Sequence, residues 1–230
     1  MTVKAVIGTH VGLRKKRNED SHLHGEHLIA IADGMGGYVS GDVASQTVIG
    51  AIRPFDREVE PGQLTLALGQ AVQAASLAMR QRITEEPAVA GMGTTLVAVM
   101  WSHGQFALAN IGDSRAYQLR AGSLTQLTDD HVYGRLLSSA GKVPTLPERL
   151  SRFLDGRLDG RSPDLSPIDV RPGDRLLLCS DGLSSYVPHE TVRAELIETD
   201  AAVAVERLIG LTLEADAPDN VTVAVIDVLP

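Results

Sequence analysis

The sequence predicts an α+β fold in which antiparallel strands form the central layers and helices lie outside them. One observation is a series of short apolar segments between 94 and 127, parted by Gly-containing turns, as in an antiparallel sheet. Another is that helical patterns gather at 42–83 and 189–215 and do not alternate with strands, which excludes a doubly wound sheet. No linker or repeat divides the 230 residues, so we expect one domain, 1–230.

The first half of the chain is predicted to hold two strands followed by two helices. Val3–Gly8 and Leu28–Ala32 are strand-like, and the second of them is an apolar run that ends at a turn signal. Helices are expected at Asp42–Ile52 and at about Leu64–Ile83, because apolar residues there recur at three- and four-residue steps. Prolines and a glycine between these two ranges separate the helices.

The second half is expected to begin with four strands arranged as an antiparallel meander. We place them at Thr94–Trp101, Gln105–Ile111, Arg115–Arg120 and Ser123–Leu127. Residues 130–172 are irregular, with helix fragments expected at 132–140 and 147–153, and long irregular segments are more often functional than idle. The chain then continues with a strand at Arg175–Ser180, helices at His189–Ile197 and Ala201–Ala215, and a strand at Val221–Leu229.

Composition and charge narrow the class of protein. Apolar residues make up 43% of the chain, which is enough for a substantial core. The net charge of −8 argues against a nucleic-acid partner, because phosphate backbones require a Lys/Arg surface. No apolar run approaches the ~18 residues of a membrane helix, and the first residues do not resemble a signal peptide. The single cysteine, Cys179, makes the cytoplasm the expected location.

Aspartates recur where predicted strands meet turns. Asp33 follows the apolar run 28–32 and is itself followed by Gly34, Met35 and two further glycines, which allow the backbone to turn and approach a ligand closely. Taken alone, this segment also fits a tight turn with an exposed carboxylate. Asp113, Asp181 and Asp219 occupy similar positions, and this recurrence favours a shared site.

The residue types leave metal chemistry as the best-supported class. A cysteine nucleophile is disfavoured because Cys179 lies in a buried strand, and Ser114 leads into a strand rather than the helix of a nucleophile elbow. Gly141-Lys142 lacks the spacing of a P-loop. Aspartate oxygens suit Mg²⁺ and Mn²⁺. The basic run 14–17 beside Glu19 and Asp20 is either a solvated face or a phosphate contact next to metal ligands.

These residues together resemble the metal-dependent protein phosphatase family, type 2C (PPM), which hydrolyses phosphoserine and phosphothreonine. The matching segments follow the family's order and span nearly the whole chain: Arg17-Asn18-Glu19-Asp20, Asp33-Gly34-Met35-Gly36-Gly37, Gly93-Thr94-Thr95, Gly112-Asp113-Ser114-Arg115, Leu178-Cys179-Ser180-Asp181-Gly182-Leu183 and Asp219-Asn220. Each segment alone is weak evidence for the family, but the ordered set of segments is specific to it. The length and the form of the second segment are similar to the compact bacterial members.

The resemblance implies a four-layer αββα sandwich, in which two antiparallel sheets are flanked by helix pairs and a dinuclear metal centre lies at one end. It implies two Mn²⁺ or Mg²⁺ ions, bridged by Asp33 and bound by the Gly34 carbonyl, Asp181 and Asp219, and a third, weaker ion held by Asp113. Asp20, helped by Glu19, would act through metal-bound waters. The segment 132–164 would be the family's mobile flap, which bears on substrate choice.

Two positions depart from the family pattern. Lys15 stands where the family has its phosphate-binding arginine, and lysine keeps the charge but loses the bidentate fork, so Arg14 or Arg17 are alternative phosphate contacts. Met35 stands where eukaryotic members have a histidine proposed as general acid, and Met35 cannot transfer protons.

The resulting hypothesis is a cytoplasmic, Mn²⁺/Mg²⁺-dependent protein serine/threonine phosphatase. In it, a metal-bridging water attacks the phosphorus and Lys15 helps to hold the phosphate. We expect phosphorylated proteins as substrates, a bacterial Ser/Thr kinase as the opposing enzyme, and neither nucleic acid nor membrane insertion. One alternative is a catalytically inactive relative that serves as a binding or scaffold module, and another is a metallohydrolase of small phosphoesters.

Overall fold

The computed structural model describes residues 1–35, 41–133, 149–157, 162–198 and 200–230. Two antiparallel sheets form its centre. The first has the order β1-β11-β10-β7-β8, with strands Thr2–His10, Val221–Leu229, Arg175–Cys179, Arg115–Arg120 and Ser123–Gln126. The second has the order β2-β3-β5-β6-β9, with strands Asp20–His24, Leu28–Met35, Leu96–Ser102, Gln105–Ile111 and Asp164–Ile168, and the short β4 (Gly93–Thr94) pairs with β3.

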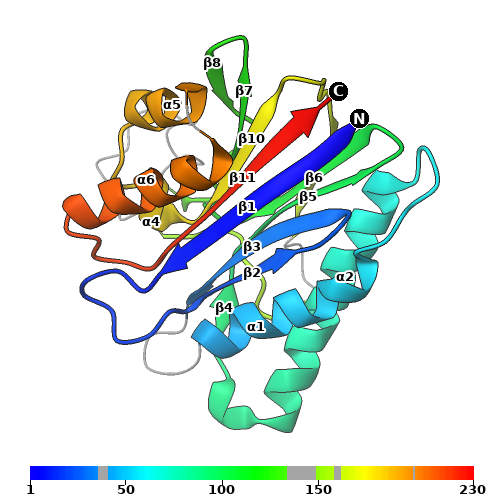
Figure 1. Cartoon of the computed structure of the whole chain (residues 1–230). Coiled ribbons are helices and arrows are strands. Elements are labelled where there is room, and N and C mark those ends of the chain that lie inside the picture. The colour runs from blue at the N-terminus through cyan, green and yellow to red at the C-terminus, as the bar shows by residue number, and fades with distance from the viewer. Residues whose placement is uncertain (36–40, 134–148, 158–161, 199) are drawn as a thin grey trace.

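Helices cover both outer faces, so the predicted αββα sandwich is confirmed (Figure 1). Helices α1 (Gly41–Ile52) and α2 (Leu64–Glu85) pack on the second sheet, and α5 (His189–Glu198) and α6 (Ala201–Glu214) pack on the first. Three short helical segments complete the described part: η1 (Arg53–Phe55), η2 (Pro87–Val89) and α4 (Asp181–Ser184). Among the described helices, none combines the length and apolar character needed to cross a membrane.

The most apolar strands, β3 and β11, appear in the sequence as uninterrupted apolar runs because both of their faces are buried. In β3, Ile29 and Ile31 face the core between the sheets, whereas the alternate residues Ala30 and Ala32 face α1 and α2. In β11, Ala224, Ile226 and Val228 likewise join the central core, and the alternate valines pack against α5 and α6. A sheet that is buried on both faces has no polar side, so apolar and polar residues do not alternate along its strands.

The predicted meander is wrong, because the chain changes sheets in the middle of it. Strands β5 and β6 lie in one sheet, whereas β7 and β8 lie in the other. The crossing occurs at Gly112, whose φ of 118° is unfavourable for a residue with a side chain, and a Cβ there would lie 2.6 Å from the Thr95 side chain. The turn thus carries Asp113 from one sheet to the other.

Further elements differ from prediction. No strand was predicted at β2, Asp20–His24, because all of its residues except Leu23 are polar. Strand β3 continues through Asp33 to Met35, because Asp33 pairs with Asp20 of β2 and the residues after it pair with β4. Residues 149–153 are not helical, and Leu150 instead forms a bridge with Val132. Strand β9 was not predicted, because its sequence is polar and contains a proline, which is tolerated at this sheet edge. The other predicted ends agree within two residues. Most of the helix expected at 132–140, namely residues 134–140, lies outside the described residues, as do Gly36, Gly37 and Lys142.

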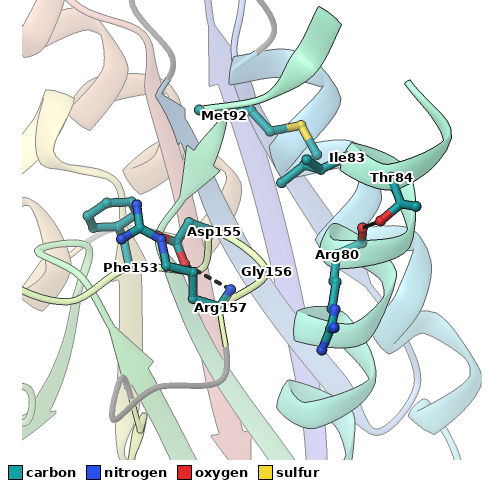
Figure 2. A pocket seen from close by; sticks show the side chains of 9 residues that line it. Arg80, Ile83, Thr84, Met92, Phe153, Asp155, Gly156 and Arg157 are labelled. Atoms are coloured by element: carbon teal, nitrogen blue, oxygen red, sulfur yellow. Dashed lines mark hydrogen bonds and ion pairs between the residues drawn. The ribbon is translucent and has the colours of Figure 1, made fainter. Parts of the chain in front are cut away.

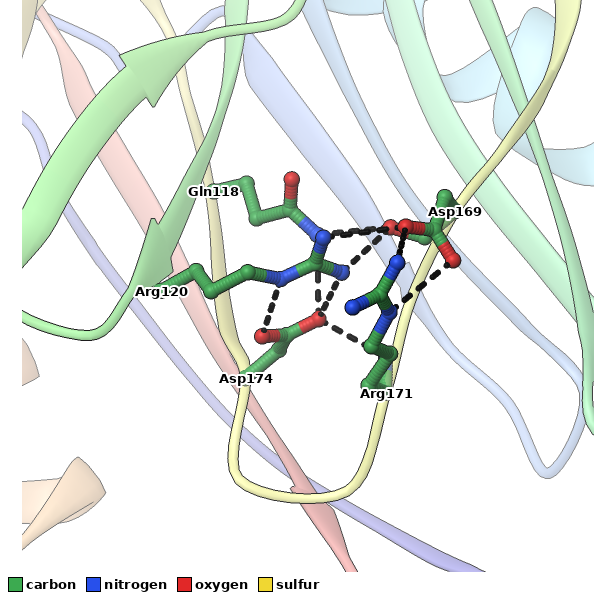
Figure 3. A network of polar contacts seen from close by, with 5 residues as sticks. All are labelled: Gln118, Arg120, Asp169, Arg171 and Asp174. Atoms are coloured by element: carbon green, nitrogen blue, oxygen red, sulfur yellow. Dashed lines mark hydrogen bonds and ion pairs between the residues drawn. The ribbon is translucent and has the colours of Figure 1, made fainter.

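A polar network surrounds Asp174, which directly precedes the first residue of β10 (Figure 3). The Asp174 carboxylate is almost fully buried and accepts hydrogen bonds from Arg120 Nε (2.8 Å) and Nη2 (2.6 Å), from Gln118 Nε2 (3.0 Å) and from the Arg171 backbone N–H (2.7 Å). Arg120 also donates to Asp169 Oδ2 at 2.9 Å. This network ties the β7–β8 hairpin to the loop before β10.

Candidate metal centre

Four aspartates distant in sequence line one cleft of about 470 Å³ at one end of the sandwich. Asp33 lies in β3, Asp113 follows β6, Asp181 begins α4 directly after β10, and Asp219 precedes β11. Both sheets therefore contribute. Lys15, Glu19, Gly34 and Met35 also line the cleft.

Hydroxyl groups hold the backbone around Asp33. Its N–H donates to Thr95 Oγ1 (3.0 Å), and Thr94 Oγ1 donates to its carbonyl oxygen (2.8 Å). The Thr95 hydroxyl in turn lies 2.7 Å from the buried Ser114 hydroxyl, next to Asp113. These contacts set the Asp33 segment against the turn that carries Asp113.

Asp20 lies in β2 directly opposite Asp33 and is buried beneath the cleft. Its Oδ2 accepts hydrogen bonds from Ser180 Oγ (2.9 Å) and Thr222 Oγ1 (2.7 Å). Its other oxygen, Oδ1, is buried without a hydrogen-bond partner among the described residues. A buried acceptor without a partner is costly, and a cation or its water is the ligand that such an atom would accept.

Burial raises the pKa of four of these carboxyl groups, and their mutual repulsion raises it further. The pKa of Asp20 rises to about 6 and that of Asp113 to about 7, while the pKa of Asp33 lies well above its ordinary value and that of Asp181 is also raised. Besides burial, the charges of Asp20 and Asp181 are among the causes that raise the pKa of Asp33. Protons or cations that neutralise part of the charge therefore stabilise the cluster.

Close backbone packing explains the glycine in the Asp33 segment. Gly34 N–H donates to the Glu19 carbonyl at 3.1 Å, and a Cβ on Gly34 would lie 2.0 Å from the Gly41 carbonyl oxygen. Asn220 secures the neighbouring loop: its Oδ1 accepts from the Glu19 N–H (2.8 Å), and its Nδ2 donates to the Arg17 carbonyl (3.0 Å). The backbone carbonyls around Gly34 and Glu19 are therefore held in place by close packing and hydrogen bonds.

Within the basic run, Lys15 is the residue that lines the cleft. Its Nζ lies 2.6 Å from Asp219 Oδ1, whereas Arg14 pairs with Asp216 and Arg17 lies 3.6 Å from Asp42. Burial lowers the pKa of Lys15, but the hydrogen bond to Asp219 and the charges of the neighbouring acids outweigh it, so the net pKa is raised.

Sequence reasoning missed a second cation in the cleft wall, Arg149, because it lies in the irregular segment without a motif. It also missed the hydroxyl of Thr222, whose signal is its position two residues after Asn220 in a strand that otherwise reads as apolar. No histidine lines the described cleft.

The donor set fits hard divalent cations. Among the described residues, no three acidic, histidine or cysteine side chains form a ready cage for a metal ion. Mg²⁺ and Mn²⁺ do not need such a cage, because they bind through one or two carboxylates and keep several waters. A mutually repelling carboxylate cluster, a rigid carbonyl and the unpartnered Asp20 oxygen match that requirement.

The comparisons identify the family. Residues 7–208 match the family model described as protein phosphatase 2C. The chain is 42% identical over 225 residues to the serine/threonine protein phosphatase PstP of Mycobacterium tuberculosis, covering 95% of this chain and 43% of PstP, and so spans less than half of that protein. It is 29% identical to the serine/threonine phosphatase stp of Listeria monocytogenes, covering 97% of this chain and 95% of stp.

Solved structures agree with this assignment. A crystal structure of M. tuberculosis PstP/Ppp superposes with a TM-score of 0.94 at 40% identity over 100% of both chains. The PstP catalytic domain in complex with two manganese ions has a TM-score of 0.91 at 41% identity over 99% of both chains. The chain belongs to the protein phosphatase 2C family.

Proposed function

We propose that this chain is a metal-dependent protein phosphatase that hydrolyses phosphoserine and phosphothreonine in other proteins. The observation that carries the proposal is the cleft in which Asp33, Asp113, Asp181 and Asp219 meet beside Lys15, on a chain of the protein phosphatase 2C family. PstP, a relative with this activity in its name, has been crystallised with two manganese ions in its catalytic domain.

Each residue has a proposed role. Asp33, the Gly34 carbonyl, Asp181 and Asp219 would hold two Mn²⁺ or Mg²⁺ ions, and Asp113 would hold a third, weaker ion. Asp20 and Glu19 would orient water in the cleft: Asp20 is fixed by two hydroxyl donors and has one oxygen left to accept. When bound, the ions supply a water of lowered pKa and neutralise charge on the phosphoryl group.

Lys15 is the proposed phosphate contact. Its ammonium group already lies in the cleft against Asp219, and Arg149 adds a second cation to the same wall. A lysine binds phosphate as a point charge, so the phosphate is held with less directional constraint than by the family's arginine. Because Met35 cannot donate a proton, protonation of the leaving serine or threonine oxygen falls to water or to another group of the cleft.

Hydrolysis of a phosphothreonine peptide tests this function. We expect turnover with Mn²⁺, none with EDTA, and none in Asp33→Asn or Asp181→Asn. Absence of turnover by folded wild-type protein that binds Mn²⁺ would instead support the scaffold alternative, with Lys15→Arg as the next protein to assay. Activity on small phosphoesters but not on phosphopeptides would support the small-molecule alternative.

The cellular setting follows from the same proposal. A protein phosphatase of this kind opposes a Ser/Thr kinase, so we propose the kinase's phosphorylated targets as substrates. The cytoplasmic location expected from the single, buried Cys179 remains a prediction. Residues 1–230 are proposed as one phosphatase domain with its flap at 132–164, of which 134–148 and 158–161 lie outside the described residues.

A further inference from the structure

A second pocket, of about 340 Å³, lies beside α2, and Figure 2 shows its lining. Phe153 lines both this pocket and the metal cleft, so the two hollows adjoin at its side chain. The pocket lies between α2, which contributes Arg80 and Ile83, and the segment 153–157.

The pocket wall is firmly built. Leu154 exchanges two backbone hydrogen bonds with Thr94 of β4, at 2.9 and 2.8 Å, and Thr94 also bonds to the Asp33 carbonyl. Gly156 has a φ of 77° and rests on α2 so closely that a Cβ would lie 2.8 Å from Arg80 N. The segment is therefore anchored to the metal cleft at one end and to α2 at the other.

The lining combines an apolar surface with positive charge. Ile83, Met92 and Phe153 supply the apolar part. Arg80 is exposed and forms no ion pair with an acid of the described chain, whereas Arg157 Nε is paired with Asp155 Oδ2 at 3.0 Å. The side chains that line the pocket thus carry a net positive charge, whereas the whole protein carries a net charge of −8. An anionic group on a short aliphatic stem is the ligand that complements it.

We propose that this pocket is a second recognition site for the phosphoprotein substrate and that it takes an acidic side chain close in sequence to the phosphorylated residue. Arg80 pairs with the carboxylate, and the stem lies on Met92 and Ile83. The spacing is compatible with this role, because an extended peptide advances ~3.3 Å per residue and passes one aromatic ring within about two residues. The inference rests on the proposed phosphatase function.

The test compares phosphothreonine peptides that carry Glu, Gln or Lys at the two residues on either side of the phosphothreonine. The proteins are wild type, Arg80→Ala, Arg80→Glu and the control Arg82→Ala. Arg82 lies on the same helix but pairs with Glu86 and does not line the pocket. We expect wild type and Arg82→Ala to favour the Glu peptide over the Gln peptide about two- to fivefold in kcat/KM, mainly through KM, since exposed ion pairs contribute modestly.

Arg80→Ala is expected to remove this preference, and Arg80→Glu to favour the Lys peptide. Equal kcat/KM for Glu and Gln peptides in wild type, or a preference that survives in Arg80→Ala, would overturn the inference. So would loss of the preference in Arg82→Ala, because it would reflect overall charge. Hydrolysis of p-nitrophenyl phosphate, which is too small to reach the pocket, is measured in parallel. If wild type hydrolyses none of the phosphothreonine peptides, the phosphatase function itself fails; if it hydrolyses them all without discriminating among them, only the pocket inference fails.

Discussion

Replacement of Asp113 by asparagine should stabilise the metal-free protein, and more so at high pH. Burial and the charge of Asp181 raise the pKa of Asp113 from 3.8 to about 7. The folded protein therefore retains a proton that the unfolded chain has released, and stability falls as pH rises from 3.8 to about 7. The asparagine of the variant is neutral in both the folded and the unfolded state, so the variant escapes this loss.

The magnitude follows from the pKa difference. Each pKa unit corresponds to about 1.4 kcal/mol, so the raised pKa costs the wild type about 2 kcal/mol at pH 5 and about 4 kcal/mol at pH 8. Urea unfolding in EDTA measures the free energy of unfolding at both pH values. We expect the advantage of Asp113→Asn over wild type to grow by about 2–3 kcal/mol between them. Glu214→Gln, which removes an exposed charge, is the control.

An advantage that is equal at pH 5 and pH 8, or a variant less stable than wild type at pH 8, would refute this reasoning. The prediction concerns the protein without metal only. In excess Mn²⁺ the advantage should shrink or reverse, because cations replace the proton as the partner of the carboxylate cluster.

Three further predictions address the backbone, the distant network and the turn at Asp113. Gly34→Ala should lose Mn²⁺ binding and turnover and lower the Tm, because its Cβ would lie 2.0 Å from the Gly41 carbonyl oxygen. Asp174→Asn should reduce the free energy of unfolding by about 2 kcal/mol in urea titrations, through weakened charged hydrogen bonds, and leave kcat/KM unchanged. His131→Ala should raise the Mn²⁺ concentration needed for half-maximal activity while the fold persists, because His131 Nδ1 accepts from the Gly112 N–H at 3.1 Å.

Gly50→Ala is the matched control for Gly34→Ala. Gly50→Ala, in α1 with open space around its Cβ, should stabilise the protein by up to about 1 kcal/mol and leave turnover unchanged. A Gly34→Ala protein with wild-type activity would show that the close approach to Gly41 is not needed. Asp174→Asn with impaired turnover would contradict a purely structural role for the network, and unchanged Mn²⁺ dependence in His131→Ala would contradict a role in placing the turn.

Much of the site could be predicted because its acids sit at the ends of strongly apolar strands. Asp181 lies just after β10 and Asp219 lies just before β11, so the sequence pattern placed each of them where a strand meets a turn. Their meeting with Asp113 depended on the crossing at Gly112, which local patterns do not reveal, since strands in the same sheet and in facing sheets look alike. The recurrence of aspartates at strand ends favoured a shared site, and the ordered motifs specified which one.

Other features were set by tertiary contacts. Asp33 was expected at a strand end, but pairing with Asp20 on one side and with β4 after it extends the strand through it. Arg149 came from a segment whose composition predicts no regular structure, and its place in the cleft depends on the bridge between Leu150 and Val132. Neither contact leaves a trace in local sequence.

The most direct test of the account is Mn²⁺ binding by calorimetry, measured together with phosphothreonine-peptide hydrolysis, in wild type and in Asp33→Asn. The account predicts at least two bound ions in wild type, turnover that rises with their occupancy, and loss of both in a folded Asp33→Asn protein. Peptide hydrolysis that persists in Asp33→Asn or in EDTA would contradict the claim that this aspartate cleft, loaded with cations, carries the reaction.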